Sequence, residues 1–185
     1  TSRDTNAVFG AWQMGAGAHA LQANLRHDDS SQFGSRTTGA IAWGYRLSPA
    51  WRVTASYGTA FKAPTFNDLY FPGFSNPALL PERSRNVEGG AYWNGAFAGT
   101  RLDASVVGYR NRLDDMILFV CDADFNCAPQ NVAAATLQGV TLDVRFRSGT
   151  TAATASIDLQ RPQDESGLLL PRRPRRHAAL AIHQP

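Results

Sequence analysis

The sequence contains no long hydrophobic run and little charge. Charged residues make up 18% of its 185 residues and hydrophobic residues 43%. The longest apolar runs, such as residues 116–121, fall far short of the ~18 consecutive apolar residues that a membrane-spanning helix requires. Helical membrane spans are therefore excluded. A β-barrel is not excluded, because its strands need only about 9–11 residues of alternating character.

Enzyme signatures are also absent. The sequence has no Gly-x-Ser-x-Gly segment, no glycine-rich phosphate loop and no His-Glu-x-x-His segment. The carboxylate pairs Asp28-Asp29 and Asp114-Asp115 each lie at a predicted boundary between strand and loop, without a partner base. We interpret both pairs as solvated loop charges, and we predict no catalytic residue, no metal site and no cofactor.

Two cysteines are present, Cys121 and Cys127, and they enclose a short polar segment. Two close cysteines in a polar loop favour a small disulfide if the protein reaches an oxidising compartment. The alternative is a pair of free thiols. A zinc site is disfavoured because such sites use about four ligands and none of the other candidates is near.

The net charge of +3 is mildly basic, and one run in residues 172–176 supplies four arginines. Such a run can bind an anionic partner. We favour a solvated cluster, or one that faces the interior of a barrel, and we predict no nucleic-acid partner.

Hydrophobic residues recur with a period of two, which predicts strands. In residues 140–147, Val140, Leu142, Val144 and Phe146 alternate with polar residues, and residues 51–62 and 153–160 repeat the pattern. An apolar row with aromatics near its ends suits lipid, and the opposite polar row suits a wet interior. The alternative is a soluble antiparallel sheet with one wet face.

We predict about nine strands and almost no helix beyond a brief turn within residues 62–70. The predicted strands span residues 5–14, 18–28, 36–47, 51–62, 83–94, 100–119, 132–147, 151–161 and 169–182.

Short and long connections are predicted to alternate along the chain. Short turns are expected at residues 15–17, 48–50, 95–99 and 148–150, and longer loops at 27–35, 63–82, 120–131 and 161–168. Short periplasmic turns opposite long extracellular loops are typical of outer-membrane barrels. The predicted fold is therefore all-β: a portion of an antiparallel up-and-down transmembrane β-barrel, about nine strands of a larger barrel, open as a fragment.

One segment carries a specific motif. The strand that ends Tyr57-Gly-Thr-Ala-Phe-Lys-Ala-Pro64 enters a loop that closes with Asn76-Pro-Ala-Leu-Leu-Pro-Glu-Arg-Ser84. This pairing resembles the TonB-dependent outer-membrane receptors, and residues 26–34, 108–117, 137–143 and 170–173 resemble the cobalamin receptor branch of that family. The resemblance extends over roughly residues 4–180.

The resemblance implies a function in nutrient uptake. Receptors of this family are barrels of 22 strands whose interior is filled by an N-terminal plug, and the TonB complex pulls on the plug to admit a bound ligand. We therefore expect a receptor and transporter, not an enzyme, in the outer membrane of a Gram-negative bacterium. Its expected partners are cobalamin or a siderophore-like ligand, the TonB complex acting through a plug, and outer-membrane lipid.

The resemblance also suggests ligand contacts. Candidates from inward-facing or loop positions are Lys62, Asn67, Tyr70, Phe74, Arg172 and Arg173. The alternative is that the motif around Pro64 only ends a strand, because proline lacks the N–H that a ladder needs. The calcium-binding loops of the cobalamin branch would precede this segment, so no metal is expected here.

Residues 1–185 are expected to form part of a barrel domain, without the plug or the closing strands. The chain opens on Thr1 and closes within a strand-like pattern, which suggests a segment of a longer protein. Alternative functions are a siderophore receptor, a passive porin or adhesin barrel, and a soluble β-sandwich that binds a ligand.

Overall fold

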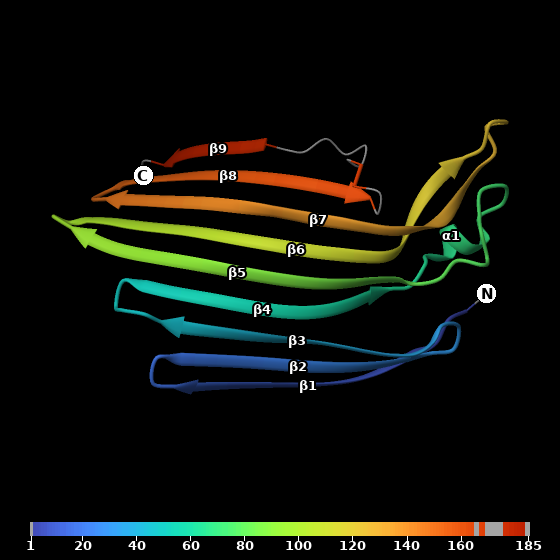
Figure 1. Cartoon of the computed structure of the whole chain (residues 1–185), viewed down its shortest axis with the longest axis horizontal. Coiled ribbons are helices and arrows are strands. Elements are labelled where there is room, and N and C mark those ends of the chain that lie inside the picture. The colour runs from blue at the N-terminus through green and yellow to red at the C-terminus, as the bar shows by residue number, and fades with distance from the viewer. Residues whose placement is uncertain (1, 165–166, 169–175, 184–185) are drawn as a thin grey trace.

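The computed structural model describes residues 2–164, 167–168 and 176–183, and it consists of one antiparallel sheet of nine strands in sequence order (Figure 1). The strands are β1 (Thr5–Ala16), β2 (His19–Ser30), β3 (Gly34–Arg46), β4 (Trp51–Lys62), β5 (Glu82–Phe97), β6 (Thr100–Cys121), β7 (Cys127–Ser148), β8 (Thr151–Asp164) and β9 (Arg176–His183). Neighbouring strands pair along the whole series from β1 to β9.

The two ends of the sheet differ. Tight turns join the strands at one end, where Gly17, Gly99 and Gly149 adopt the positive φ values of 58°, 77° and 54° that favour glycine. The other end carries the N-terminus, the long β4–β5 connection and the helix α1 (Phe66–Tyr70) (Figure 1). We call these the turn end and the loop end. No helix in the described part of the chain has the length and apolar character needed to cross a membrane.

The register of the sheet separates apolar from polar residues. Directly opposed residues of antiparallel strands share a face. Tyr57 opposes Val87, Val106 opposes Leu142, and Leu142 opposes Ile157, so these side chains form one continuous apolar face. We call it the outer face. The inner face carries Ser56 opposite Glu88, together with other polar pairs such as Asp143 opposite Ser156.

The apolar outer face is the more exposed of the two. Val87, for example, is 55% exposed, while its neighbour Glu88 on the inner face is partly buried. Among the described residues, the buried hydrophobic side chains are only Leu69, Leu79 and Ala135. No second layer covers the outer face of the described sheet, so the chain is not a sandwich with a core between two sheets. This is the arrangement expected of a barrel wall whose outer face contacts lipid.

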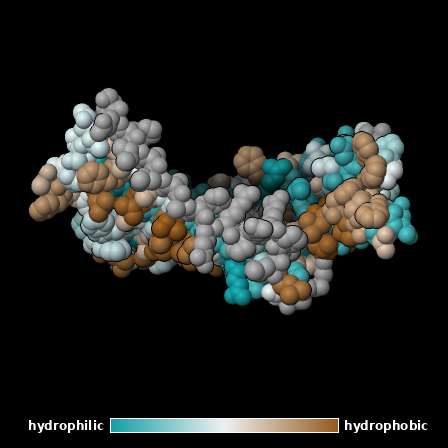
Figure 2. Space-filling model, turned by 90° about the horizontal axis from the view of Figure 1, so that it is seen from above, coloured by the Kyte–Doolittle hydropathy of each residue, from teal (hydrophilic) through white to brown (hydrophobic). Residues whose placement is uncertain are grey.

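The sheet is curved. Figure 2, which is seen from above the view of Figure 1, shows a bowed body that is hollowed on one side. Curvature of this kind is needed for strands to form part of a barrel wall. Within the described residues β1 pairs only with β2, and β9 only with β8, so the sheet is open at both edges.

Two predicted loops are much shorter than expected. The β2–β3 connection is only residues 31–33, and the β6–β7 connection is residues 122–126. The predicted loop at 27–35 was wrong because polar residues continue the ladder: Asp28 opposes Arg36, and Asp29 opposes Ser35 and accepts a hydrogen bond from its hydroxyl at 2.9 Å. The long connections are therefore residues 63–81 between β4 and β5 and residues 165–175 between β8 and β9.

A charged substitution on the outer face tests its contact with lipid. In a complete barrel that carries this segment, Val106→Arg should lower the free energy of unfolding by about 2–4 kcal/mol, because it places a charge in hydrocarbon. Ser105→Arg is the matched control, since Ser105 lies on the inner face opposite Asp143. Denaturant unfolding in lipid vesicles measures both, and equal losses would contradict the assignment of the faces.

Candidate functional site

The β4–β5 connection, residues 63–81, forms a compact platform at the loop end. β4 ends at Lys62, and Pro64 is fully buried beyond it. Thr65 then caps α1: its hydroxyl accepts from the Asp68 N–H at 3.2 Å, and the Asp68 carboxylate accepts from the Thr65 N–H at 2.8 Å. This reciprocal capping box satisfies backbone donors at the start of the helix. The brief turn expected in residues 62–70 is thus a capped helix of one turn.

A small core fixes the underside of the platform. Leu69 of α1 is 0% exposed and Leu79 is 3% exposed, although most of the sheet has no buried core at all. Truncating a buried leucine costs about 2–5 kcal/mol in globular proteins. The platform is therefore held by packing as well as by its two strand ends.

The N-terminal side of the platform is attached to the β2–β3 turn. Arg3 donates a hydrogen bond to the carbonyl of Pro64 at 2.9 Å and another to Gln32 at 2.9 Å. Its guanidinium also lies over the rings of Phe33 and Phe66, at 4.8 and 4.9 Å from their centroids. Arg3 therefore joins three segments that are far apart in the sequence.

The opposite side of the platform is attached to β6 and β7. The Asn131 side chain accepts from the Leu80 N–H at 2.8 Å and donates to the carbonyls of Leu80 at 3.0 Å and Asp115 at 2.7 Å. The Asn76 amide donates to the carbonyl of Pro129 at 3.1 Å. These bonds connect the loop to the part of the β6–β7 hairpin that lies nearest the loop end.

Aromatic side chains cover the exposed surface of the platform. The rings of Phe71 and Phe74 lie 6.4 Å apart, and Phe74 lies 6.3 Å from Phe119 of β6. The three side chains are 50%, 51% and 61% exposed. We call them the aromatic cluster. Exposed rings of this kind can stack on a flat or apolar ligand.

The predicted ligand residues fall into three groups. Asn67, Tyr70 and Phe74 lie in the platform and are exposed, and Tyr70 accepts a hydrogen bond from Gln32 at 2.7 Å. Lys62 lies at its base, where it pairs with Glu82 at 3.0 Å.

The remaining two candidates, Arg172 and Arg173, lie outside the described residues. Sequence reasoning missed Phe71, Phe119 and Asn131. An aromatic count within residues 63–81 would have indicated Phe71, but nothing in the sequence indicates that Phe119 and Asn131 reach this loop.

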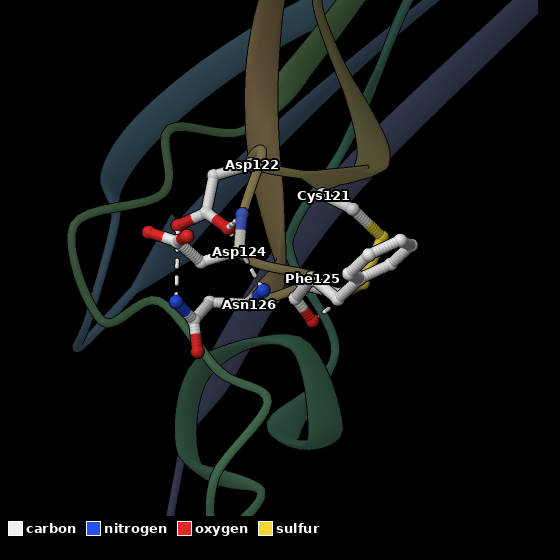
Figure 3. The surroundings of a disulfide bond; sticks show 6 residues. Cys121, Asp122, Asp124, Phe125 and Asn126 are labelled. Atoms are coloured by element: carbon white, nitrogen blue, oxygen red, sulfur yellow. Dashed lines mark hydrogen bonds between the residues drawn. A yellow bond between two sulfur atoms is a disulfide. The ribbon is translucent and has the colours of Figure 1, made fainter.

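A disulfide closes the tip of the β6–β7 hairpin. Cys121 and Cys127 are directly opposed and covalently joined, and the five residues between them form the turn (Figure 3). Within the turn, the Asp122 carboxylate accepts from the N–H groups of Asp124 and Asn126, both at 2.9 Å. Hydrogen bonds from the Asn126 backbone and side chain hold the pKa of Asp122 below its ordinary value.

The described residues contain no group of three or more His, Cys, Asp or Glu side chains placed to hold a metal ion. The Asp122 carboxylate already accepts hydrogen bonds within its own turn. The exposed groups of the platform are aromatic rings, an amide and a hydroxyl, at Phe71, Phe74, Asn67 and Tyr70.

A curved antiparallel sheet with an apolar outer face and a polar inner face is the wall of a transmembrane β-barrel. The family model described as "TonB dependent receptor-like, beta-barrel" matches residues 1–183. The chain belongs to this family, whose members are receptors and transporters and not a class of enzymes.

Curated relatives share the sequence over most of this chain. A protein of Vibrio cholerae serotype O1 named "Vitamin B12 transporter BtuB" is 35% identical over 170 residues, which cover 90% of this chain and 26% of that protein. The protein of the same name from Photobacterium profundum is 33% identical over 169 residues, covering 88% and 27%. The chain thus spans about a quarter of the length of the curated relatives it matches.

Solved structures share the fold at lower identity. The copper transporter OprC superposes with a TM-score of 0.78 at 20% identity, over 96% of this chain and 31% of its own. The siderophore receptor PirA from Pseudomonas aeruginosa gives 0.75 at 20% identity, over 88% and 32%. The Serratia marcescens hemophore receptor HasR gives 0.77 at 17% identity, over 88% and 34%.

Removing the Asn131 amide should loosen the platform. Asn131→Ala breaks three hydrogen bonds and leaves the Leu80 N–H without its acceptor, so the Leu80 amide should exchange with solvent roughly 5- to 150-fold faster, as expected for a loss of about 1–3 kcal/mol. Hydrogen exchange followed by mass spectrometry measures the exchange rate of the Leu80 amide. Asn67→Ala is the matched control, because no described residue bonds the Asn67 side chain; equal exchange in both variants would contradict this role.

Acid should disorder the hairpin tip. Because the pKa of Asp122 is lowered in the folded state, its contribution to the order of the turn is present at neutral pH and is lost as the pH falls through that lowered pKa. The amides of Asp124 and Asn126 should therefore lose protection in acid, as measured by NMR. Asp122→Asn, which keeps a neutral acceptor, should remove the pH dependence; an unchanged profile in this variant would refute the mechanism.

Proposed function

We propose that this chain is part of the barrel of a TonB-dependent outer-membrane transporter that binds cobalamin and imports it with energy supplied through TonB. The observation that carries the proposal is the set of relatives named "Vitamin B12 transporter BtuB", which are 33–35% identical over about 90% of this chain. The proposed location is the outer membrane of a Gram-negative bacterium, and the plug through which TonB would act belongs to a part of the protein beyond these residues.

The two faces of the sheet support transport through the barrel interior. The apolar outer face suits hydrocarbon, while the inner face offers hydroxyl, amide and charged groups to water and to a plug. Nine strands supply only part of the wall. A closed barrel also needs partners for the edges of β1 and β9, because unpaired backbone groups in hydrocarbon each cost several kcal/mol.

The platform supports ligand capture at the extracellular end. Long loops of outer-membrane barrels face the exterior, so the β4–β5 connection would meet a ligand first. Its aromatic cluster and the exposed Asn67 and Tyr70 combine apolar surface with hydrogen-bonding groups, as ligand sites generally do. In this proposal Lys62 positions the base of the platform through Glu82, and the exposed rings contact the ligand.

Siderophore uptake is the second candidate. PirA, a siderophore receptor, shares the fold at a TM-score of 0.75 and 20% identity, a level of identity that concerns the fold alone. The cobalamin proposal is preferred because the relatives named "Vitamin B12 transporter BtuB" are 33% and 35% identical to this chain, whereas PirA is 20% identical.

Ligand binding tests both candidates. The purified complete barrel that carries this segment should bind cyanocobalamin, and Phe74→Ala together with Phe119→Ala should weaken binding roughly 5- to 150-fold, because the loss of two exposed rings removes about 1–3 kcal/mol of stacking and apolar contact. Isothermal titration calorimetry measures the affinity for cyanocobalamin, a ferric siderophore, haem and Cu²⁺.

The control is Phe97→Ala, which removes an exposed ring at the turn end, remote from the platform. It should bind with unchanged affinity. Binding of the ferric siderophore without binding of cyanocobalamin would replace the first candidate by the second, and no binding of any of these four ligands would refute both.

A further inference from the structure

The far end of the β6–β7 hairpin has no neighbouring strand among the described residues. β5 pairs with β6 only as far as Asp114, and β8 pairs with β7 only from Ala135 onward. Beyond these points, residues 116–121 and 127–132 pair only with each other, and we call this two-stranded segment the distal hairpin. A single pair of strands is at best marginally stable in water. The distal hairpin therefore needs support that the rest of the sheet does not.

Two features weaken the backbone pairing of the distal hairpin. Asp115, directly before it on β6, has a φ of 58°, a conformation that residues other than glycine seldom adopt. Pro129, which opposes Phe119, has no N–H to donate to the ladder. The last part of β6 turns away from the direction of the rest of the strand, and the hairpin tip stands beside the platform that carries α1 (Figure 1). Pairing alone thus holds this segment weakly.

The distal hairpin holds the C-terminal half of the platform. Asn131 bonds both the N–H and the carbonyl of Leu80, at 2.8 and 3.0 Å. The Asn76 amide donates to the carbonyl of Pro129 at 3.1 Å, and Pro129 is itself buried. Separation of the two hairpin strands would therefore release the platform backbone at two places at once.

The distal hairpin also supplies part of the aromatic cluster. Phe119, whose ring lies 6.3 Å from that of Phe74, belongs to the hairpin and not to the platform. At the base of the hairpin, the Ile117 N–H donates to one carboxylate oxygen of Glu82 at 2.8 Å, while the other oxygen pairs with Lys62 at 3.0 Å. The place of the Phe119 ring in the cluster thus depends on the hairpin remaining paired.

A covalent bond closes the distal hairpin at its free end. Cys121 and Cys127 are its last opposed pair, and they are joined by the disulfide (Figure 3). Residues 122–126, which form the tip, are all exposed, so packing does not hold the tip in place. A cross-link between two strands removes conformations in which the strands separate, and so favours the paired state. The disulfide supplies the support that neighbouring strands give elsewhere in the sheet.

We propose that Cys121 and Cys127 are positioning residues for ligand capture: their disulfide keeps the distal hairpin paired, and the paired hairpin holds Phe119 beside Phe74 and fixes the platform. Without it, the platform would keep its attachment through Arg3 on the opposite side but lose its support from β6 and β7. The inference rests on the proposed function in one respect, that the platform captures the nutrient, and it holds for either nutrient.

The first test measures ligand affinity in the complete barrel that carries this segment. Cys121→Ser with Cys127→Ser removes the cross-link, and we call this double variant the serine variant. If its distal hairpin is ordered in about one molecule in ten, the apparent affinity for cyanocobalamin falls roughly tenfold.

Isothermal titration calorimetry measures the affinity. Phe125→Ala is the matched control, because it removes an 87% exposed side chain from the same tip and leaves the disulfide intact, so its affinity should not change. Equal affinities in the serine variant and the unmodified barrel would overturn the proposal.

Hydrogen exchange separates a positioning role from a contribution to the stability of the whole barrel. In the serine variant the Leu80 amide should exchange roughly tenfold faster, because the hairpin that bonds it opens more often. The amides of the paired parts of β4 and β5 should exchange at unchanged rates, and the denaturant midpoint of the barrel should not move. Faster exchange throughout these strands would show that the disulfide only stabilises the fold, and it would refute the positioning role.

Reduction and reoxidation of the unmodified barrel provide a rescue. A phosphine reductant breaks the S–S bond: the disulfide takes up two electrons and two protons to give two thiols, and the phosphine becomes its oxide with oxygen from water. Once the reductant is removed, the barrel should bind cyanocobalamin as weakly as the serine variant. Oxidised glutathione then re-forms the bond by exchange and leaves as two molecules of glutathione, and the affinity should return; a reduced barrel that binds as tightly as the oxidised one would contradict the proposal.

The positioning role and the proposed nutrient fail separately. No binding of cyanocobalamin by the unmodified barrel would refute the nutrient, whereas the exchange of the Leu80 amide tests the positioning role without any ligand. Unchanged Leu80 exchange in the serine variant, in a barrel that binds cyanocobalamin, would refute the positioning role and leave the nutrient in place.

Discussion

Hydrogen bonds between neighbouring strands are the interaction on which this structure depends, because a chain in hydrocarbon has no water to satisfy its backbone. The continuous register from β1 to β9 satisfies the strands between the two edges and, at the same time, assigns every side chain to one face. A shift of one residue would exchange the faces, placing Glu88 and Asp143 in lipid. The register that pairs the backbones therefore also separates the apolar face from the polar face. Because the apolar face contacts lipid, the sheet needs no buried hydrophobic core.

Sequence reasoning found the sheet because its signal is local. The alternation of apolar and polar residues at 140–147 indicates a strand with one face toward lipid and one toward water. Pro64 marks the end of β4 because proline has no N–H to donate to a neighbouring strand. The same reasoning failed at residues 27–35, where polar residues resemble a loop but belong to β2 and β3 and form side-chain hydrogen bonds across the two strands, between Ser35 and Asp29 and between His27 and Thr37. The polarity of a segment indicates whether its side chains prefer water. Whether its backbone pairs in a sheet depends on the strand beside it, which the segment's own sequence does not reveal.

The candidate site was only partly predictable for a related reason. Asn67, Tyr70 and Phe74 belong to one loop and were found together, whereas Phe119 contacts Phe74 from 45 residues further along the chain and Asn131 bonds Leu80 from 51 residues further along. Both residues reach the loop because β6 and β7 have 22 residues each, about twice the 9–11 residues that a membrane-spanning strand needs. At about 3.3 Å per residue, the 22 residues of β6 extend roughly 70 Å, well beyond the bilayer.

The residues that hold the platform in place are not the residues that it exposes to solvent. Arg3 and Asn131 hold the backbone through carbonyl and amide groups, which every residue supplies, while the rings of Phe71 and Phe74 point into solvent and are not needed for those bonds. Substitutions at the exposed positions can therefore accumulate in evolution without unfolding the loop. If the rings contact the ligand as proposed, a change of a few exposed side chains would alter ligand preference while the hydrogen bonds of Arg3 and Asn131 keep the loop folded.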